Sequence, residues 1–190
     1  MNDKRGRDGQ DLDACVEEDF IKLIKEKPLA KISVEELIEK SCVSKAFFYR
    51  RFRTKEAVAT SCLARIFNKM GPIEFPGRPV REAIESCLDC LLSHKETLLP
   101  LHENGLIGLI HPLIKDRVSQ GLAPYVAGKK LTFQAEHSIA AHSGALCELV
   151  KLWMDYGMEQ SPQDLMEATG LASVREDRLC YLAGPFWQTN

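Results

Sequence analysis

The chain has 190 residues, of which 45% are hydrophobic and 27% are charged. This composition excludes a disordered or fibrous protein and is typical of a globular one, either a single domain or a small module joined to a larger one. The net charge is −2, from 25 basic and 27 acidic residues. Total charge therefore gives no reason to expect a nucleic acid or an anionic membrane as partner, although its local distribution does.

Two features bear on location. No segment approaches the roughly 18 apolar residues of a membrane span, and the first twenty residues lack the apolar stretch of a signal peptide. The seven cysteines are an odd number scattered along the chain, which favours reduced thiols over a disulfide scaffold. We therefore expect a cytoplasmic protein without membrane contact.

The N-terminal residues predict a helix behind a short arm. Residues 1–10 are polar and charged, and we expect them to form a flexible arm. Apolar residues then recur at three- and four-residue steps from Leu12 to Ile24, which predicts a helix that ends near Lys27, just before Pro28.

Three further helices are marked by their N-caps. Ser33 and Glu36 have the spacing of a capping box, which predicts a helix from Val34 to Lys40 or Ser41. Ser44 caps the next helix, which ends near Phe52. Thr54 caps a fourth, from Lys55 to about Lys69. Two short helices separated by a three-residue turn, with a preceding helix to cover them, are typical of a helix-turn-helix.

The rest of the chain is predicted to be helical, with no convincing strand. Residues 70–79 contain three prolines and two glycines and indicate a linker. The expected elements are one long apolar stripe from Val80 to Leu101, a short piece from Leu106 to Lys115 broken at Pro112, a helix from Asp116 to Ala127 interrupted by Pro124, the longest helix from Leu131 to Gly157, and a helix starting at Ser161–Asp164. The tail from Ala172 onward gives weak signals.

Charge is concentrated around the second helix of the motif. Six basic residues and no acidic one lie between Lys40 and Lys55, whereas Asp11 to Asp19 carry five acids and no base. A helical projection with Phe48 and Phe52 on the buried side places Ala46, Arg50 and Arg53 on the opposite side. A solvated charge run is the simpler interpretation. The coincidence of caps, short turn and missing acids instead favours DNA binding.

Such a helix fits the major groove, where base edges are read while flanking cations and hydroxyls contact phosphates. Four basic side chains, those of Lys45, Arg50, Arg51 and Lys55, would supply the cations, and Tyr49 the hydroxyl. If a dimer neutralises about four phosphates per protomer, the logarithm of its affinity falls with the logarithm of salt concentration with a slope of about −7.

The segment from Val43 to Glu56, Val-Ser-Lys-x-x-Phe-Tyr-x-x-Phe-x-x-Lys-Glu, resembles the DNA-binding domain of the TetR family of bacterial transcription regulators. The similarity extends from about Asp11 to Lys69. It implies an all-α protein: an N-terminal three-helix helix-turn-helix domain, residues 11–70, followed by a larger helical ligand-binding and dimerisation domain, residues 71–190. It also implies a homodimer that binds double-stranded DNA at a near-palindromic site, and a small-molecule effector.

The resemblance carries over to individual positions. It places Lys45, Ala46 and Phe47 near base edges, Tyr49 at a phosphate, and Arg51 at a position that is commonly a polar or basic DNA contact. The candidate DNA-binding residues are Ser33, Ser44, Lys45, Ala46, Phe47, Tyr49, Arg50, Arg51 and Lys55. Two residues depart from the family pattern, since Cys42 stands where the turn usually has glycine and Phe47 where a small polar residue is common.

Residues 144–162 resemble the C-terminal domain of a TetR subgroup that includes regulators of dihydroxyacetone kinase operons. Some members of that subgroup activate transcription with a protein partner, so repression is only the default expectation. The alternative is a TetR-like co-regulator that acts mainly through a protein partner, with Phe47 on the protein-facing surface.

No pattern supports catalysis, and we expect neither an enzyme nor a cofactor or metal. Cys87 and Cys90 have the spacing of half a zinc site, but no second pair follows, so core packing is favoured. Three histidines, His94, His102 and His111, could converge in a ligand pocket, although scattered histidines are more often surface groups. The sequence does not identify ligand-binding residues. An unrecognised helical enzyme using cysteine or histidine chemistry is the remaining alternative.

Overall fold

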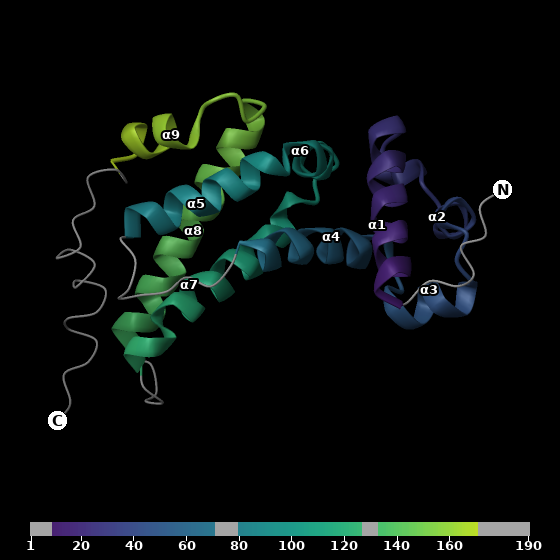
Figure 1. Cartoon of the computed structure of the whole chain (residues 1–190), viewed down its shortest axis with the longest axis horizontal. Coiled ribbons are helices and arrows are strands. Elements are labelled where there is room, and N and C mark those ends of the chain that lie inside the picture. Colours follow the sequence, from purple (N-terminus) through teal and green to yellow (C-terminus); the bar gives the residue numbers. More distant parts are fainter. Residues whose placement is uncertain (1–8, 71–79, 127–132, 171–190) are drawn as a thin grey trace. The chain divides into compact units, whose positions relative to one another are not determined.

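The computed structural model describes residues 9–70, 80–126 and 133–170, and their regular structure is helical throughout (Figure 1). No strand occurs within these ranges, so the predicted all-α class is confirmed. Internal contacts divide the chain into two compact units. The first contains the described residues up to Arg65 together with Glu96–Leu109; the second contains Ile66–Lys95 and the described residues from Ile110 onward.

The first unit begins with a helix and ends with one that follows much later in the sequence. Its helices are α1 (Gly9–Glu26), the 3-10 helix η1 (Leu29–Lys31), α2 (Val34–Ser41), α3 (Lys45–Arg51), most of α4 (Lys55–Lys69), α6 (Lys95–Glu103) and the 3-10 helix η2 (Ile107–Leu109). The predicted bounds of the first four α-helices agree with these to within a few residues. α1 starts two residues inside the predicted arm; residues 1–8 of that arm lie outside the described residues.

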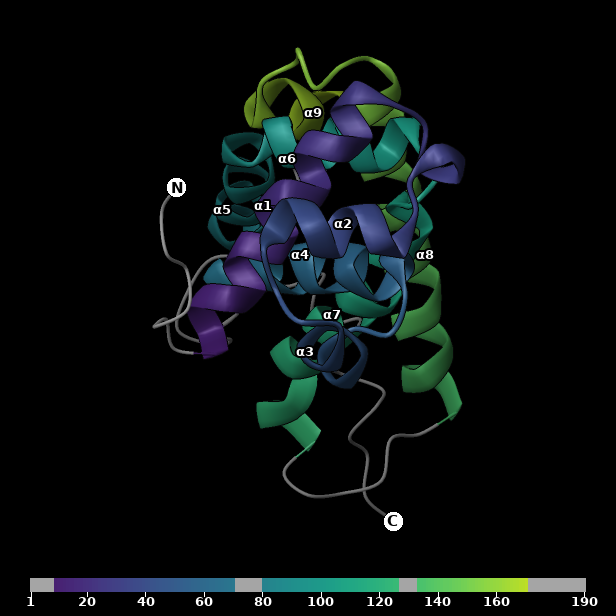
Figure 2. The same ribbon diagram turned by 90° about the vertical axis from the view of Figure 1, so that its right-hand side faces the viewer.

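One apolar core holds the first four α-helices of this unit together. Val16 and Phe20 of α1, Leu37 of α2, Phe48 of α3 and Leu63 of α4 are all fully buried. In both Figure 1 and Figure 2, α3 lies below α1 and α2, at the edge of the unit. The core therefore fixes α3 by one face and leaves its other face at the surface.

Polar side chains join the segment of α6 to the end of α1. Asn104, just after α6, accepts a hydrogen bond from the Leu29 N–H through its Oδ1 at 2.7 Å, and its Nδ2 donates to the Ile24 carbonyl at 3.2 Å. Lys25 and Glu96 add an exposed ion pair at 2.9 Å. A segment that the sequence assigned to the larger domain thus completes the N-terminal unit.

We expect Asn104→Ala to lower the stability of the protein markedly. The substitution leaves a backbone donor and a backbone acceptor at the end of α1 without their partner, which costs about 2 kcal/mol and about 4 to 8 °C in Tm for a chain of this size. Thermal unfolding followed by circular dichroism measures the change. Asn68→Ala, at an exposed position on α4, is the control; equal losses for the two variants would contradict the assignment.

The second unit consists of the end of α4 with four further helices among the described residues. These are α5 (Val80–Ser93), α7 (Ile110–Val126), α8 (Phe133–Asp155) and α9 (Pro162–Ala168). α8 packs along α7, and α9 packs against α5. The predicted start of the last helix is confirmed: Ser161 is the N-cap, Pro162 is the first helical residue, and Ser161 and Asp164 form a reciprocal capping box.

Three predicted elements of this region were wrong. The stripe from Val80 to Leu101 is divided into α5 and α6 at His94. The sequence did not predict this break because the apolar spacing continues across it. The two pieces expected from Leu106 to Ala127 are mostly one helix, α7. Pro112 is its third residue, where the backbone N–H has no intrahelical partner to lose, so proline is tolerated there. The predicted linker at residues 71–79 and the tail from residue 171 lie outside the described residues.

Candidate nucleic-acid interface

The two helices of the motif are set by side-chain caps, as the sequence predicts. The Ser33 hydroxyl accepts a hydrogen bond from the Glu36 N–H at 3.0 Å, and the Ser44 hydroxyl accepts one from the Phe47 N–H at 3.1 Å. The Glu36 carboxylate also accepts from the Lys27 ammonium at 2.6 Å, which is the largest reason that its pKa is lowered. Each serine therefore defines where its helix begins.

The turn between these helices contains a strained residue. Cys42 has φ 54° and ψ 35°, the left-handed conformation that favours glycine. Its N–H donates to the Glu39 carbonyl, and the following Val43 N–H donates to the Ile38 carbonyl. These bonds close the end of α2 and lead the chain into α3.

Cys42→Gly is expected to stabilise the protein. The substitution removes the Cβ that opposes the left-handed conformation. It should raise the free energy of unfolding by about 1 kcal/mol and Tm by roughly 2 to 4 °C. The side chain is exposed, so little packing is lost. Cys42→Ala is the matched control, because it removes the thiol but keeps the Cβ. Thermal unfolding would contradict this account if alanine stabilised as much as glycine.

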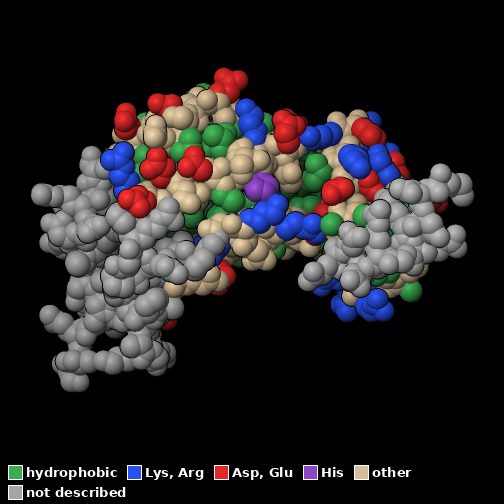
Figure 3. Space-filling view, viewed as in Figure 1, with side chains coloured by type: hydrophobic (Ala, Val, Ile, Leu, Met, Phe, Trp, Pro, Cys, Tyr) green, Lys and Arg blue, Asp and Glu red, His purple; other side chains and the backbone are tan. Residues whose placement is uncertain are grey.

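α3 has an apolar back and a basic front. Phe48 is fully buried, Phe52 is 5% exposed, and their rings lie 5.7 Å apart. Ala46 and Arg50 are exposed on the opposite side, as the helical projection predicts. Figure 3 shows Lys and Arg side chains gathered at the place where α3 lies in Figure 1.

The remaining candidates on α3 are also accessible. Lys45 is exposed at the first residue of the helix, and Phe47 is half-buried. Tyr49 is 46% exposed and packs edge-on against the Phe48 ring at 5.8 Å, which leaves its ring at the surface. Lys45, Arg50 and Arg53 have no acidic partner among the described residues. Their full positive charge is therefore available to an anionic ligand.

Lys55 has an internal role. Its ammonium donates to the carbonyls of Leu29 at 2.8 Å and Ile32 at 2.5 Å, and its side chain is half-buried. The bonds fasten the segment between α1 and α2 to the start of α4. Lys55 therefore supports the motif, and its contact with a phosphate stays a prediction.

Arg51 is paired with an acid that the sequence interpretation missed. Its Nε donates to the Asp13 Oδ2 of α1 at 2.7 Å. One turn further along α1, Glu17 accepts from the Ser61 hydroxyl at 2.7 Å and lies 2.8 Å from the Arg65 Nε. The i, i+4 spacing of these acids beside the apolar stripe of α1 was a usable signal, but their partners are distant in sequence.

Burial raises the pKa of the Glu17 carboxyl, and the Ser61 and Arg65 groups partly offset that rise. Burial likewise raises the pKa of the Cys62 thiol on α4, which makes it an unreactive core residue.

Cys87 and Cys90 are both half-buried on α5, consistent with the packing interpretation. In the part of the chain that the structure describes, no group of three or more potential ligands could hold a metal ion.

Two of the three histidines singled out by the sequence, His94 and His111, lie in the second unit and have different surroundings. His94 Nδ1 lies 2.8 Å from the Cys90 carbonyl oxygen, and its Nε2 lies 3.3 Å from the Lys69 ammonium, whereas His111 is exposed on α7.

Within the described ranges, no helix is both long and apolar enough to cross a membrane.

The comparisons with known proteins agree with this geometry. Residues 21–62 match the family model of bacterial regulatory proteins, tetR family. The fold is similar to the crystal structure of a TetR transcriptional regulator from Streptococcus agalactiae 2603V, with a TM-score of 0.58 and 15% identity over 84% of this chain and 92% of that one. No curated protein matches the sequence. The matched family and the structural neighbour are transcription regulators, not enzymes.

Proposed function

We propose that this chain, whose residues 21–62 match the family model of bacterial regulatory proteins, tetR family, is a sequence-specific, DNA-binding transcription regulator. The observation that carries the proposal is the capped helix α3, with Phe48 in the core and Lys45 and Arg50 exposed without an acidic partner among the described residues; Arg53, just after the helix, is exposed in the same way. Ala46 and Phe47 at its N-terminal end are candidates for contact with base edges, where an apolar side chain can press against a thymine methyl group.

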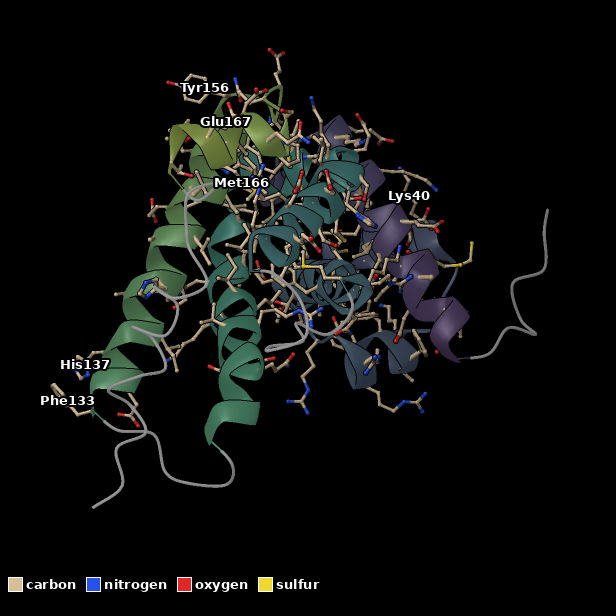
Figure 4. The ribbon with its side chains drawn as sticks, turned by 60° about the vertical axis from the view of Figure 1, so that its left-hand side comes forward. Lys40, Phe133, His137, Tyr156, Met166 and Glu167 are labelled. Atoms are coloured by element: carbon tan, nitrogen blue, oxygen red, sulfur yellow. The ribbon has the colours of Figure 1, made fainter. Side chains whose placement is uncertain are left out.

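A homodimer is the second part of the proposal. One face of α8 is exposed at Ala141, Ala145 and Leu152 and continues to Tyr156, just after the end of the helix; the spacing of four or seven residues follows a single side of a helix. Leu152 is 53% exposed and Tyr156 64% exposed. Figure 4 shows Tyr156 near one end of α8 and Phe133 and His137 near the other, all directed outward. A second copy would cover this apolar face.

Two such chains would present two α3 helices to one side of a duplex. Heads separated by one helical turn of DNA, about 34 Å, match a near-palindromic site. Selection of bound duplexes from a random-sequence pool tests binding, specificity and site symmetry together. We expect two inverted half-sites about one turn apart; recovery of unselected sequences would contradict specific recognition.

Repression and response to a small ligand complete the proposal and rest on the family resemblance, as does the dihydroxyacetone kinase regulator subgroup suggested by residues 144–162. A ligand that moves the dimer from 99:1 to 1:99 occupancy of the DNA-binding conformation must favour the other conformation by about 5.5 kcal/mol. Transcription from a promoter that carries the selected site should fall when the protein is added. An increase would instead indicate an activator.

A further inference from the structure

Asp13 is a buried acid whose interactions do not account for it as a stabilising group. Its side chain is 11% exposed, and only Oδ2 is used, by the Arg51 Nε at 2.7 Å. The other oxygen, Oδ1, is buried without a hydrogen-bond partner among the described residues. A half-satisfied buried carboxylate costs stability compared with an apolar residue of similar size. Its presence calls for a role beyond folding.

The pair leaves the outer part of Arg51 free. Asp13 binds the guanidinium from the side, through Nε, so the N–H groups on Nη1 and Nη2 remain for another acceptor. The Arg51 side chain is 57% exposed, and its Cζ lies 6.0 Å from the centre of the Phe52 ring, which is part of the core. The guanidinium is thus anchored on its inner side and open on its outer side.

The anchor itself is rigid. Asp13 lies on α1 one turn before Glu17, and the Glu17 carboxylate is tied to Ser61 and Arg65 of α4. These contacts hold the face of α1 that carries Asp13 against α4. A long, flexible arginine on α3 is therefore fixed by a neighbouring helix before any ligand arrives.

We propose that Asp13 is a positioning residue for DNA binding, which holds Arg51 with its Nη1 and Nη2 groups ready to bind a backbone phosphate. The inference rests on the proposed function. Immobilising an arginine during binding costs conformational entropy, and a side chain already ordered avoids that cost. An acid that competed with a phosphate for Arg51 would bind Nη1 and Nη2, the outer nitrogens of the guanidinium. Asp13 instead binds Nε.

The test is a double-mutant cycle on affinity for a mixed-sequence duplex of about three helical turns. The proteins are the wild type, Asp13→Asn, Arg51→Gln and the double variant. Glu18→Gln is the charge control: Glu18 is exposed on α1, about 140° around the helix from Asp13, and its loss changes the net charge equally. Dissociation constants are measured over a range of salt concentrations, and thermal unfolding is recorded for each variant.

We expect Asp13→Asn to bind about tenfold more weakly than Glu18→Gln, although each substitution removes one negative charge. Arg51→Gln should make the slope of log affinity against log salt shallower by about 2 for a dimer. In that background, Asp13→Asn should have no further effect on affinity. A purely structural Asp13 would weaken binding equally in both backgrounds, and a competing Asp13 would give tighter binding than Glu18→Gln; either result overturns the inference.

Failure of the proposed function is distinguishable, because the wild type would then show no salt-dependent binding to DNA. A measurement on the unmodified protein covers the case in which Asp13→Asn does not fold. The Nε–H order parameter of Arg51, measured by NMR without DNA, should clearly exceed that of the exposed neighbour Arg50. Equal values would show that Arg51 is not held in advance, and the inference would be wrong.

Discussion

Reversal of the charge at Arg50 is expected to abolish specific DNA binding. In Arg50→Glu, a carboxylate replaces a guanidinium that is exposed on the front of α3 and has no acidic partner within the described residues. A charged hydrogen bond is worth about 1.5 to 3 kcal/mol, and a dimer loses two of them. The affinity should therefore fall by at least about a hundredfold.

The same substitution at a different site separates this effect from net charge. Arg81 is exposed on α5, and Arg81→Glu changes the charge of the chain by the same amount. Fluorescence anisotropy with a labelled duplex should show near wild-type affinity for Arg81→Glu. The phosphate-contact role of α3 would be refuted by equal losses for the two variants, because the binding would then follow total charge alone.

A charge on the outer face of α8 should separate the two subunits. Leu152→Glu places a carboxylate in the centre of the face that we propose as the dimer interface, where an unpaired buried charge costs several kcal/mol and would dissociate a marginal dimer. Because a palindromic site is held by two heads, the monomer should bind it at least about a hundredfold more weakly. Sedimentation measures the mass of the assembly, and fluorescence anisotropy measures the affinity for the duplex.

Gln160→Glu provides the control for this experiment. Gln160 is exposed beyond the end of α8, and its substitution adds the same charge. It should leave both mass and affinity close to those of the wild type. If the Leu152→Glu protein stayed dimeric, the dimer interface would have to lie elsewhere on the chain.

Local signals predicted the motif well because its determinants are close in sequence. Ser33, Ser44 and Thr54 each bond to an N–H three residues later, so a capping pattern contains the whole interaction. The left-handed backbone at Cys42 agrees with the family resemblance, which places Cys42 where the turn usually has glycine. The outward position of Arg50 follows from the period of a helix fixed by Phe48.

Contacts between distant residues could not be predicted in this way. Asn104 bonds to residues 75 and 80 positions earlier, and Arg51 to one 38 positions earlier. A hydrophobic pattern records that a face is buried, but it does not identify the polar partner on another helix. For the same reason the sequence did not reveal that the fold supplies two carbonyls to the Lys55 ammonium.

The central claim is that the front of α3 binds duplex DNA, and amide hydrogen exchange tests it most directly. The full-length protein would be compared with and without a duplex that carries the selected site. We predict slower exchange over α3 and the turn that precedes it, residues 42–53, with Arg50→Glu removing the protection. Unchanged exchange there, with protection elsewhere on the chain, would contradict the account.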